Sequence, residues 1–106
     1  MKKSIFYNGF IINQIHNGSF RVTRNDDSDE HTHLRNLSAC YKLIDNINHK
    51  KIPKRCGLYY LESHIRLANN DEYKRKLQNY YNVKVQKGRK EQYFKKNINT
   101  KKRKDL

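Results

Sequence analysis

The sequence is poor in glycine, proline, cysteine and tryptophan, and it has no long apolar run. Its 106 residues include four glycines, one proline, two cysteines and no tryptophan. No stretch approaches the roughly 18 consecutive apolar residues that a membrane-spanning helix needs. The apolar run that follows the basic N-terminus is broken by Asn8-Gly9, so it does not make a secretory signal. We therefore expect a cytoplasmic protein with no membrane partner.

Acidic residues are also scarce. Ten Asp and Glu stand against 24 Lys and Arg, which gives a formal net charge of +14. Self-repulsion on this scale opposes folding, so the excess is typical of a protein whose partner is a polyanion. Residues 1–50 hold seven cations and five acids, whereas residues 51–106 hold seventeen and five. We therefore expect the second half of the chain to meet the polyanion.

Recognisable catalytic machinery is missing as well. There is no phosphate-cradling glycine-rich loop and no nucleophile elbow. Cys40 and Cys56 are too few for a disulfide framework, so we expect two reduced thiols, at least one of them in the core. His31 and His33 lie beside the acids of residues 26–30, but their spacing matches no zinc motif. The sequence predicts no enzyme, no catalytic residue, no metal ligand and no cofactor.

What is present in the first half predicts an antiparallel meander of three or four strands. Asn-Gly pairs occur at residues 8–9 and 17–18, and each is flanked by short apolar runs. This dipeptide is the strongest local signal for a hairpin because both central residues of a type I′ turn need positive φ. Residues 20–23 alternate between apolar and polar side chains, and residues 30–34 complete the expected sheet.

A helix that follows the strands, still within the first half of the chain, should cover one face of this sheet. Asn36 is the expected N-cap, and apolar residues at 37, 40, 41, 44 and 47 recur at helical spacing. We expect this helix to end near His49 or Lys50, since Pro53 follows closely.

Two more helices are expected in the second half. The first follows Gly57, with Leu58, Leu61 and Ile65 on its apolar stripe. Asn69-Asn70 interrupts the pattern and caps the next helix, whose apolar face is formed by residues 73, 77, 80 and 81. Residues 83 and 85 either extend that helix or start a short strand.

The predicted fold class is therefore α+β. Residues 1–50 form the meander and its covering helix, and residues 51–94 form a basic region with a helix-turn-helix-like pair packed on it. Residues 1–94 are expected to make one compact domain. Residues 95–106 are predicted to be a disordered basic tail, because their composition buries too little apolar surface to fold alone.

Residues 74–104 contain thirteen Lys and Arg and a single acid, Glu91. Cations near phosphates release condensed counterions, and exposed aromatic rings among them can stack on unpaired bases. Tyr80 and Tyr81 either stack in this way or belong to the core. The predicted nucleic-acid-binding residues are Arg66, Lys74, Arg75, Lys76, Lys84, Lys87, Arg89, Lys90, Tyr93, Lys95, Lys96, Lys101, Lys102, Arg103 and Lys104.

Two sequence-specific modes of binding stay open. The helix that begins near Asp71 carries Arg, Gln and Asn, which read base edges, and it follows another helix after a short turn. Alternatively, a small sheet backed by one helix is similar in outline to the DNA-binding domains at the start of phage and transposon integrases. That resemblance covers residues 5–50 and rests on topology. It implies contacts through the sheet from Arg21, Thr23, Arg24 and Arg35.

The sequence best fits a small basic nucleic-acid-binding accessory protein that binds the phosphate backbone of DNA or RNA through its C-terminal half. Thirteen Asn, with many Lys and Ile, have A/T-rich codons, which suggests a phage or mobile element of a low-GC host. One alternative is a phage-type inhibitor or regulator of a host nucleic-acid-processing complex, which is an anti-defence protein. A small metal-dependent nuclease using residues 26–33 is a third interpretation.

Overall fold

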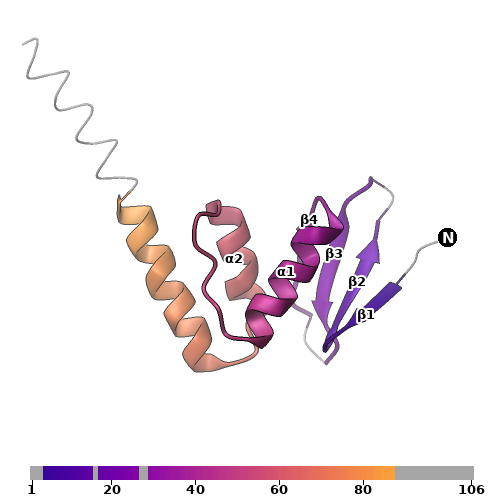
Figure 1. Cartoon of the computed structure of the whole chain (residues 1–106), viewed down its shortest axis with the longest axis horizontal. Helices are drawn as coiled ribbons and strands as arrows, with labels where there is room; N and C mark the ends of the chain where they lie inside the picture. Colours follow the sequence, from indigo (N-terminus) through magenta and orange to yellow (C-terminus); the bar gives the residue numbers. More distant parts are fainter. Residues whose placement is uncertain (1–3, 16, 27–28, 88–106) are drawn as a thin grey trace, which may run out of the picture.

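The computed structural model describes residues 4–15, 17–26 and 29–87, which form a four-stranded antiparallel sheet followed by three helices (Figure 1). The elements are β1 (Ser4–Tyr7), β2 (Phe10–Gln14), β3 (Phe20–Arg24), β4 (His31–Leu34), α1 (Leu37–Asn48) and α2 (Leu58–Leu67). Residues 71–87, orange in Figure 1, are helical and are called the third helix below. The predicted α+β class is confirmed.

The sheet is a meander in the order β1-β2-β3-β4, with every neighbouring pair antiparallel. Tyr7 pairs with Phe10 across the first turn, where Asn8 and Gly9 have φ of 45° and 89°. These are the positive angles that the Asn-Gly pair predicts. Gly18 also has positive φ, 85°, in the next turn. Both turns lie where the sequence indicates them.

One face of the sheet forms part of the core. Phe10, Ile12, Val22 and Leu34 are buried on it, as the alternation of the strands requires. Figure 1 shows α1 and α2 on this side of the sheet and the third helix beyond them. The opposite face has no helix over it within the described part of the chain.

Helix α1 begins and ends close to the predicted residues. The Asn36 side chain accepts a hydrogen bond from the Ala39 backbone N–H at 2.8 Å, and His49 is the C-cap. Cys40, Ile44 and Ile47 are buried as expected, and Leu43, which the predicted stripe leaves out, is buried with them. Burial raises the pKa of the Cys40 thiol to about 11, so this thiol is a core group of low reactivity.

Helix α2 corrects the predicted stripe. Leu58, expected on the apolar face, is 39% exposed, whereas Ser63 and His64 are buried together with Leu61 and Leu67. The two polar side chains are buried because each has a hydrogen-bond partner, which removes the desolvation penalty. Hydrophobic periodicity cannot detect such positions.

The third helix begins where the sequence predicts it. The Asn70 side chain accepts a hydrogen bond from the Tyr73 backbone N–H at 2.9 Å, which is the expected N-cap interaction. Tyr73 and Leu77 are buried and Tyr80 and Tyr81 are half-buried, so the predicted apolar face is confirmed. The helix continues through residues 83 and 85, which excludes a strand there. The predicted tail, residues 95–106, lies outside the described residues.

In the described part of the chain, no helix combines the length and the apolar composition that a membrane span needs.

Candidate nucleic-acid interface

The side of the third helix that faces away from the core is mostly polar, with Val83 as an exposed apolar residue. Four exposed residues recur there at intervals of four, three and four positions, which places them on one helix face. We call this set the outer stripe: it consists of Arg75, Asn79, Asn82 and Gln86. The apolar residues at 73 and 77 lie on the opposite side, so the core holds this helix with the stripe toward solvent.

Cations lie along both edges of the outer stripe. Lys76 and Lys87 are exposed along one edge, together with Val83, which is 62% exposed. Lys74 is exposed along the other edge, which faces α2. Lys76 Nζ lies 3.7 Å from a Glu72 carboxylate oxygen, and both side chains are more than 60% exposed. An ion pair as exposed as this contributes little and opens readily.

A second group of cations lies in the loop between α1 and α2. Four side chains in residues 50–55 are exposed, and these residues, called the basic loop below, contain no acid. The exposed members are Lys50, Lys51, Lys54 and Arg55. The loop runs alongside the third helix (Figure 1), and the Tyr73 hydroxyl donates to the Lys51 carbonyl at 2.5 Å.

The basic loop starts with an unusual helix end. The backbone N–H of Lys50 donates to Ile47 O at 3.2 Å and that of Lys51 to Asn46 O at 2.8 Å, which is the Schellman pattern. Lys50 occupies the left-handed position of this motif with φ of 55°, where glycine is the usual residue. A lysine here costs about 1 kcal/mol relative to an unstrained residue.

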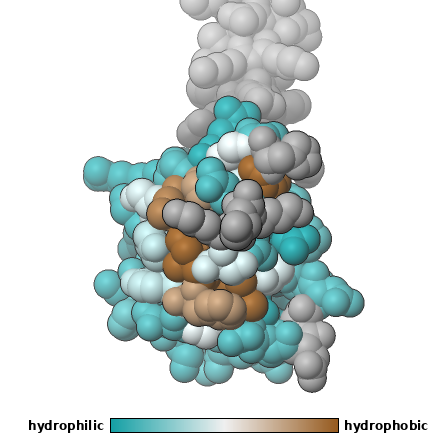
Figure 2. Space-filling model, turned by 90° about the vertical axis from the view of Figure 1, so that its right-hand side faces the viewer, coloured by the Kyte–Doolittle hydropathy of each residue, from teal (hydrophilic) through white to brown (hydrophobic). Residues whose placement is uncertain are grey.

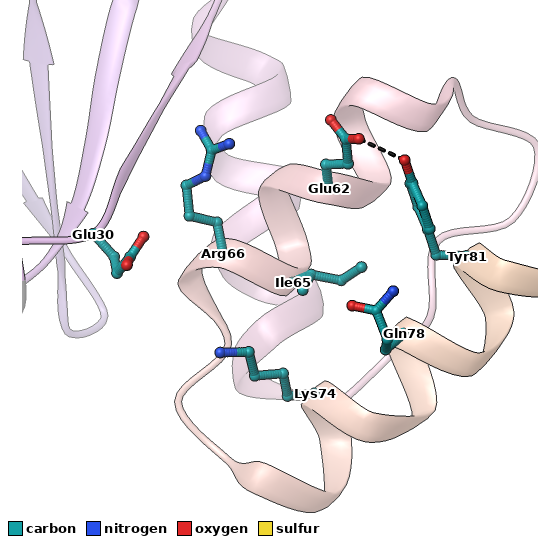
Figure 3. A pocket seen from close by; sticks show the side chains of 7 residues that line it. All are labelled: Glu30, Glu62, Ile65, Arg66, Lys74, Gln78 and Tyr81. Carbon is teal, nitrogen blue, oxygen red and sulfur yellow. Dashed lines mark hydrogen bonds between the residues drawn. The ribbon is translucent and has the colours of Figure 1, made fainter.

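A pocket lies between α2, the third helix and the start of β4 (Figure 3). Its walls bring two acids, Glu30 and Glu62, close to two cations, Arg66 and Lys74. The Tyr81 hydroxyl donates to Glu62 Oε1 at 2.6 Å, and this bond raises the pKa of Tyr81. The pocket is mixed in charge, so it is less suited to phosphate than the basic loop.

The predicted binding residues thus fall into several groups. Arg75 lies on the outer stripe, Lys76 and Lys87 lie along its edge, and Arg66 and Lys74 line the pocket. Lys84 is half-buried, with Nζ 6.0 Å from the centre of the Tyr80 ring, so it faces inward. The remainder lie outside the described residues: Arg89, Lys90, Tyr93, Lys95, Lys96, Lys101, Lys102, Arg103 and Lys104.

Several residues of this surface were missed at the level of sequence. Asn82 and Gln86 could have been found, because they continue the helical spacing set by Arg75 and Asn79. The basic loop could also have been found, since the run Lys-Lys-Ile-Pro-Lys-Arg is dense in charge. The sequence does not show that this loop lies beside the third helix, because that depends on tertiary packing.

The tyrosines of the third helix serve the core. Tyr80 and Tyr81 are half-buried, and the Tyr81 hydroxyl is bonded to α2. Stacking on bases needs an exposed ring face. The described part of this helix therefore lacks an aromatic platform for unpaired bases.

The outer face of the sheet is a second accessible surface. One row of paired residues crosses all four strands as Phe6, Ile11, Thr23 and His31, and Phe6 is 70% exposed. Figure 2, which views this side of the molecule, shows hydrophobic side chains grouped among hydrophilic ones.

A parallel row on the same face holds the polar residues Asn13, Arg21 and His33. The sheet contacts implied by the integrase resemblance are only partly accessible. Arg21 and Thr23 lie on the outer face, but Arg24 alternates to the other side. There its Nη1 donates to Ala68 O at 2.7 Å and its Nε lies 3.1 Å from Asp26.

The histidines considered for a nuclease centre also lie on the outer face. The rings of His31 and His33 meet edge to face, with centroids 5.1 Å apart. Desolvation, followed by the charges of His31 and Arg21, lowers the pKa of His33. Across residues 4–15, 17–26 and 29–87, no group of three His, Cys, Asp or Glu side chains is placed to hold a metal ion.

No family model, no curated protein and no solved structure matches this chain.

Proposed function

We propose that this chain is a small nucleic-acid-binding accessory protein of a phage or mobile element, which holds the phosphate backbone through its second half. The observation that carries the proposal is the exposure of the basic loop next to the cation-edged third helix. A surface of this kind attracts a polyanion and costs the free protein stability through self-repulsion.

The charge of this region is not neutralised internally. Residues 51–87 hold nine Lys and Arg against three acids. Lys76 pairs with Glu72 across the solvent-exposed helix surface, where the pair contributes little. Exposed cations can displace counterions from phosphates, and these gains sum across the contact.

A charge-removal series tests this function. We expect Lys54→Gln, Arg55→Gln and Lys87→Gln, combined in one protein, to weaken binding to a labelled duplex. The slope of log affinity against log salt should become shallower by roughly 0.9 for each phosphate contact that is lost. The measurement is fluorescence anisotropy over a salt series.

Lys42→Gln is the matched control, because Lys42 is exposed on α1, outside this surface. It should leave the slope unchanged. Circular dichroism should show equal helix content in all the variants. A triple variant that binds like the native protein would contradict the proposal.

A second candidate function is regulation of a host nucleic-acid-processing complex. The row of Phe6 and Ile11 on the uncovered sheet face favours it, because an exposed apolar patch on a small protein marks a contact site. This candidate predicts that Phe6→Thr disrupts association with the complex and leaves the binding of free nucleic acid intact. If the native chain binds no free nucleic acid at low salt, this second function is favoured.

A further inference from the structure

We propose that the third helix enters the major groove of duplex DNA and reads base edges with the outer stripe, Arg75, Asn79, Asn82 and Gln86. This inference rests on the proposed nucleic-acid binding and names its substrate class and mode. It begins from the composition of the stripe, in which three amides and one guanidinium are exposed in succession on one helix face.

The chemistry of the stripe matches base edges better than phosphates. Asparagine and glutamine form paired hydrogen bonds with adenine N6 and N7, and arginine forms them with guanine O6 and N7. Asn and Gln can also contact phosphate oxygens, but they carry no charge to neutralise them, so a purely electrostatic surface would place Lys or Arg at these positions. Gln78 Nε2 donates to Asn82 Oδ1 at 3.1 Å, which restrains the orientation of the Asn82 amide before any ligand is bound.

Val83 adds an apolar contact at the edge of the stripe. It follows Asn79 by one helical turn, and its side chain is 62% exposed. An apolar side chain within a polar reading face can contact the methyl group of thymine. Amides for adenine together with Val83 for thymine predict a target that contains A·T pairs.

The dimensions agree with groove entry. The rise of an α-helix places residues 75 and 86 about 16 Å apart along the axis, which spans roughly five stacked base pairs. A helix with its side chains is about 10–12 Å across, and the major groove of B-DNA is about 12 Å wide. The stripe is long enough to read one face of a short site.

The charges beside the stripe are placed for the groove walls. Lys74 lies along one edge, and Lys76 and Lys87 lie along the other edge. A helix in the major groove has a phosphate strand on each side, so cations on both edges complement both strands. Asp71 and Glu72, at the start of the helix, repel phosphates, so we expect the DNA contact to lie at residues 75–86.

Other nucleic acids fit this helix less well. The major groove of A-form RNA is too deep and narrow for side-chain reading. Single strands are bound by stacking on exposed aromatic rings, and in residues 71–87 the tyrosine rings are buried or half-buried. The preceding helix α2, joined by a turn of three residues, gives the pair the arrangement of a helix-turn-helix. Duplex DNA is the ligand that these features share.

The test starts with the full-length protein and a duplex DNA library with a randomised central segment. The enriched duplex is then compared with a scrambled duplex, with its own single strand and with duplex RNA of the same sequence. Asn79→Ala and Asn82→Ala should each lower affinity for the enriched duplex by between roughly 5-fold and 150-fold. Their affinity for the scrambled duplex and the salt slope should not change. Gln14→Ala, an exposed amide at the end of β2, is the control.

Each outcome separates the inference from the function on which it rests. Enrichment of a site, with loss of discrimination in the amide variants, supports groove reading. Salt-dependent binding without an enriched site, or equal affinity for single strands or duplex RNA, overturns groove reading and leaves the proposed function intact. The absence of binding to any of these probes at low salt overturns both.

Discussion

At the scale of single residues, tyrosine hydroxyls and a buried histidine hold together a core that has few apolar side chains. Tyr7 donates to Asp45, Tyr60 to Ala39 O and Tyr59 to His33 O, so each hydroxyl joins separate segments. A tyrosine buries a ring and keeps a polar group for such a bond. The tyrosine content predicts either a thin core or a binding surface. Tyr7 and Tyr60 are half-buried and pack against the core, whereas the Tyr59 ring is 54% exposed.

His64 is the buried residue with the most pH-sensitive environment. Its side chain is 0% exposed. The two hydrogen bonds of the ring require the neutral form, because Nδ1 donates to Tyr60 O at 2.8 Å and Nε2 accepts from Asn46 at 3.1 Å. Burial lowers the pKa of His64 to about 4, and the bond to Tyr60 opposes the shift weakly. The neutral ring is therefore part of the native packing, and the charged ring is not.

This environment predicts a specific loss of stability in acid. Because the folded pKa lies below the unfolded value near 6.5, the contribution of His64 is complete above pH 6.5. It is lost as the pH falls toward 4, by up to roughly 3 kcal/mol in all. Urea unfolding at pH 7 and pH 5 should show the fall in the free energy of unfolding, and His64→Gln should show a smaller fall. An equal fall in both proteins would contradict the assignment.

The sequence predicts such positions poorly. Residue 64 carries no apolar signal, and its burial depends on Asn46, eighteen positions away in α1. The buried pair of Thr32 and Ser63, with hydroxyl oxygens 2.6 Å apart, depends in the same way on β4 meeting α2. Local patterns cannot anticipate partners that the tertiary fold supplies.

At the scale of elements, local signals predicted most of what the structure contains. The Asn-Gly turns, the caps at Asn36 and Asn70 and the apolar face of the third helix act within a few residues, and all are found in the structure. The predicted α2 stripe was wrong at Leu58, which is exposed, while Leu61 is buried and Ile65 packs against the core. It also left out Ser63 and His64, which are buried. The charge of the basic loop is visible in the sequence, but its place beside the third helix is a tertiary contact that local patterns do not show.

At the end of α1, Lys50 is expected to lower the free energy of unfolding and to strengthen DNA binding. Lys50→Gly should raise the free energy of unfolding by about 1 kcal/mol, because glycine adopts positive φ without strain. The same change should weaken DNA binding, since it removes one cation of the basic loop. Thermal unfolding and anisotropy measure the two effects. Lys50→Arg should change neither, and stronger binding by the glycine variant would refute the role given to this loop.

At the scale of the whole molecule, charge and packing are separated. The sheet, α1 and α2 enclose the core, and the third helix turns one side to that core and a polar stripe to solvent. The first fifty residues carry little net charge, so the polyanion partner is expected at the basic loop and the third helix. The excess of cations in the second half of the chain could be predicted from sequence, and the orientation of the third helix relative to the core follows from the burial of Tyr73 and Leu77.

A titration of the intact chain against labelled duplex DNA over a range of salt concentrations tests whether the basic surface binds a polyanion. The chain should bind tightly at low salt, and log affinity should fall linearly with log salt. The slope should correspond to several phosphate contacts at roughly −0.9 each. If the chain binds no nucleic acid at low salt, or binds it with an affinity that salt does not change, the basic surface does not serve the function proposed for it.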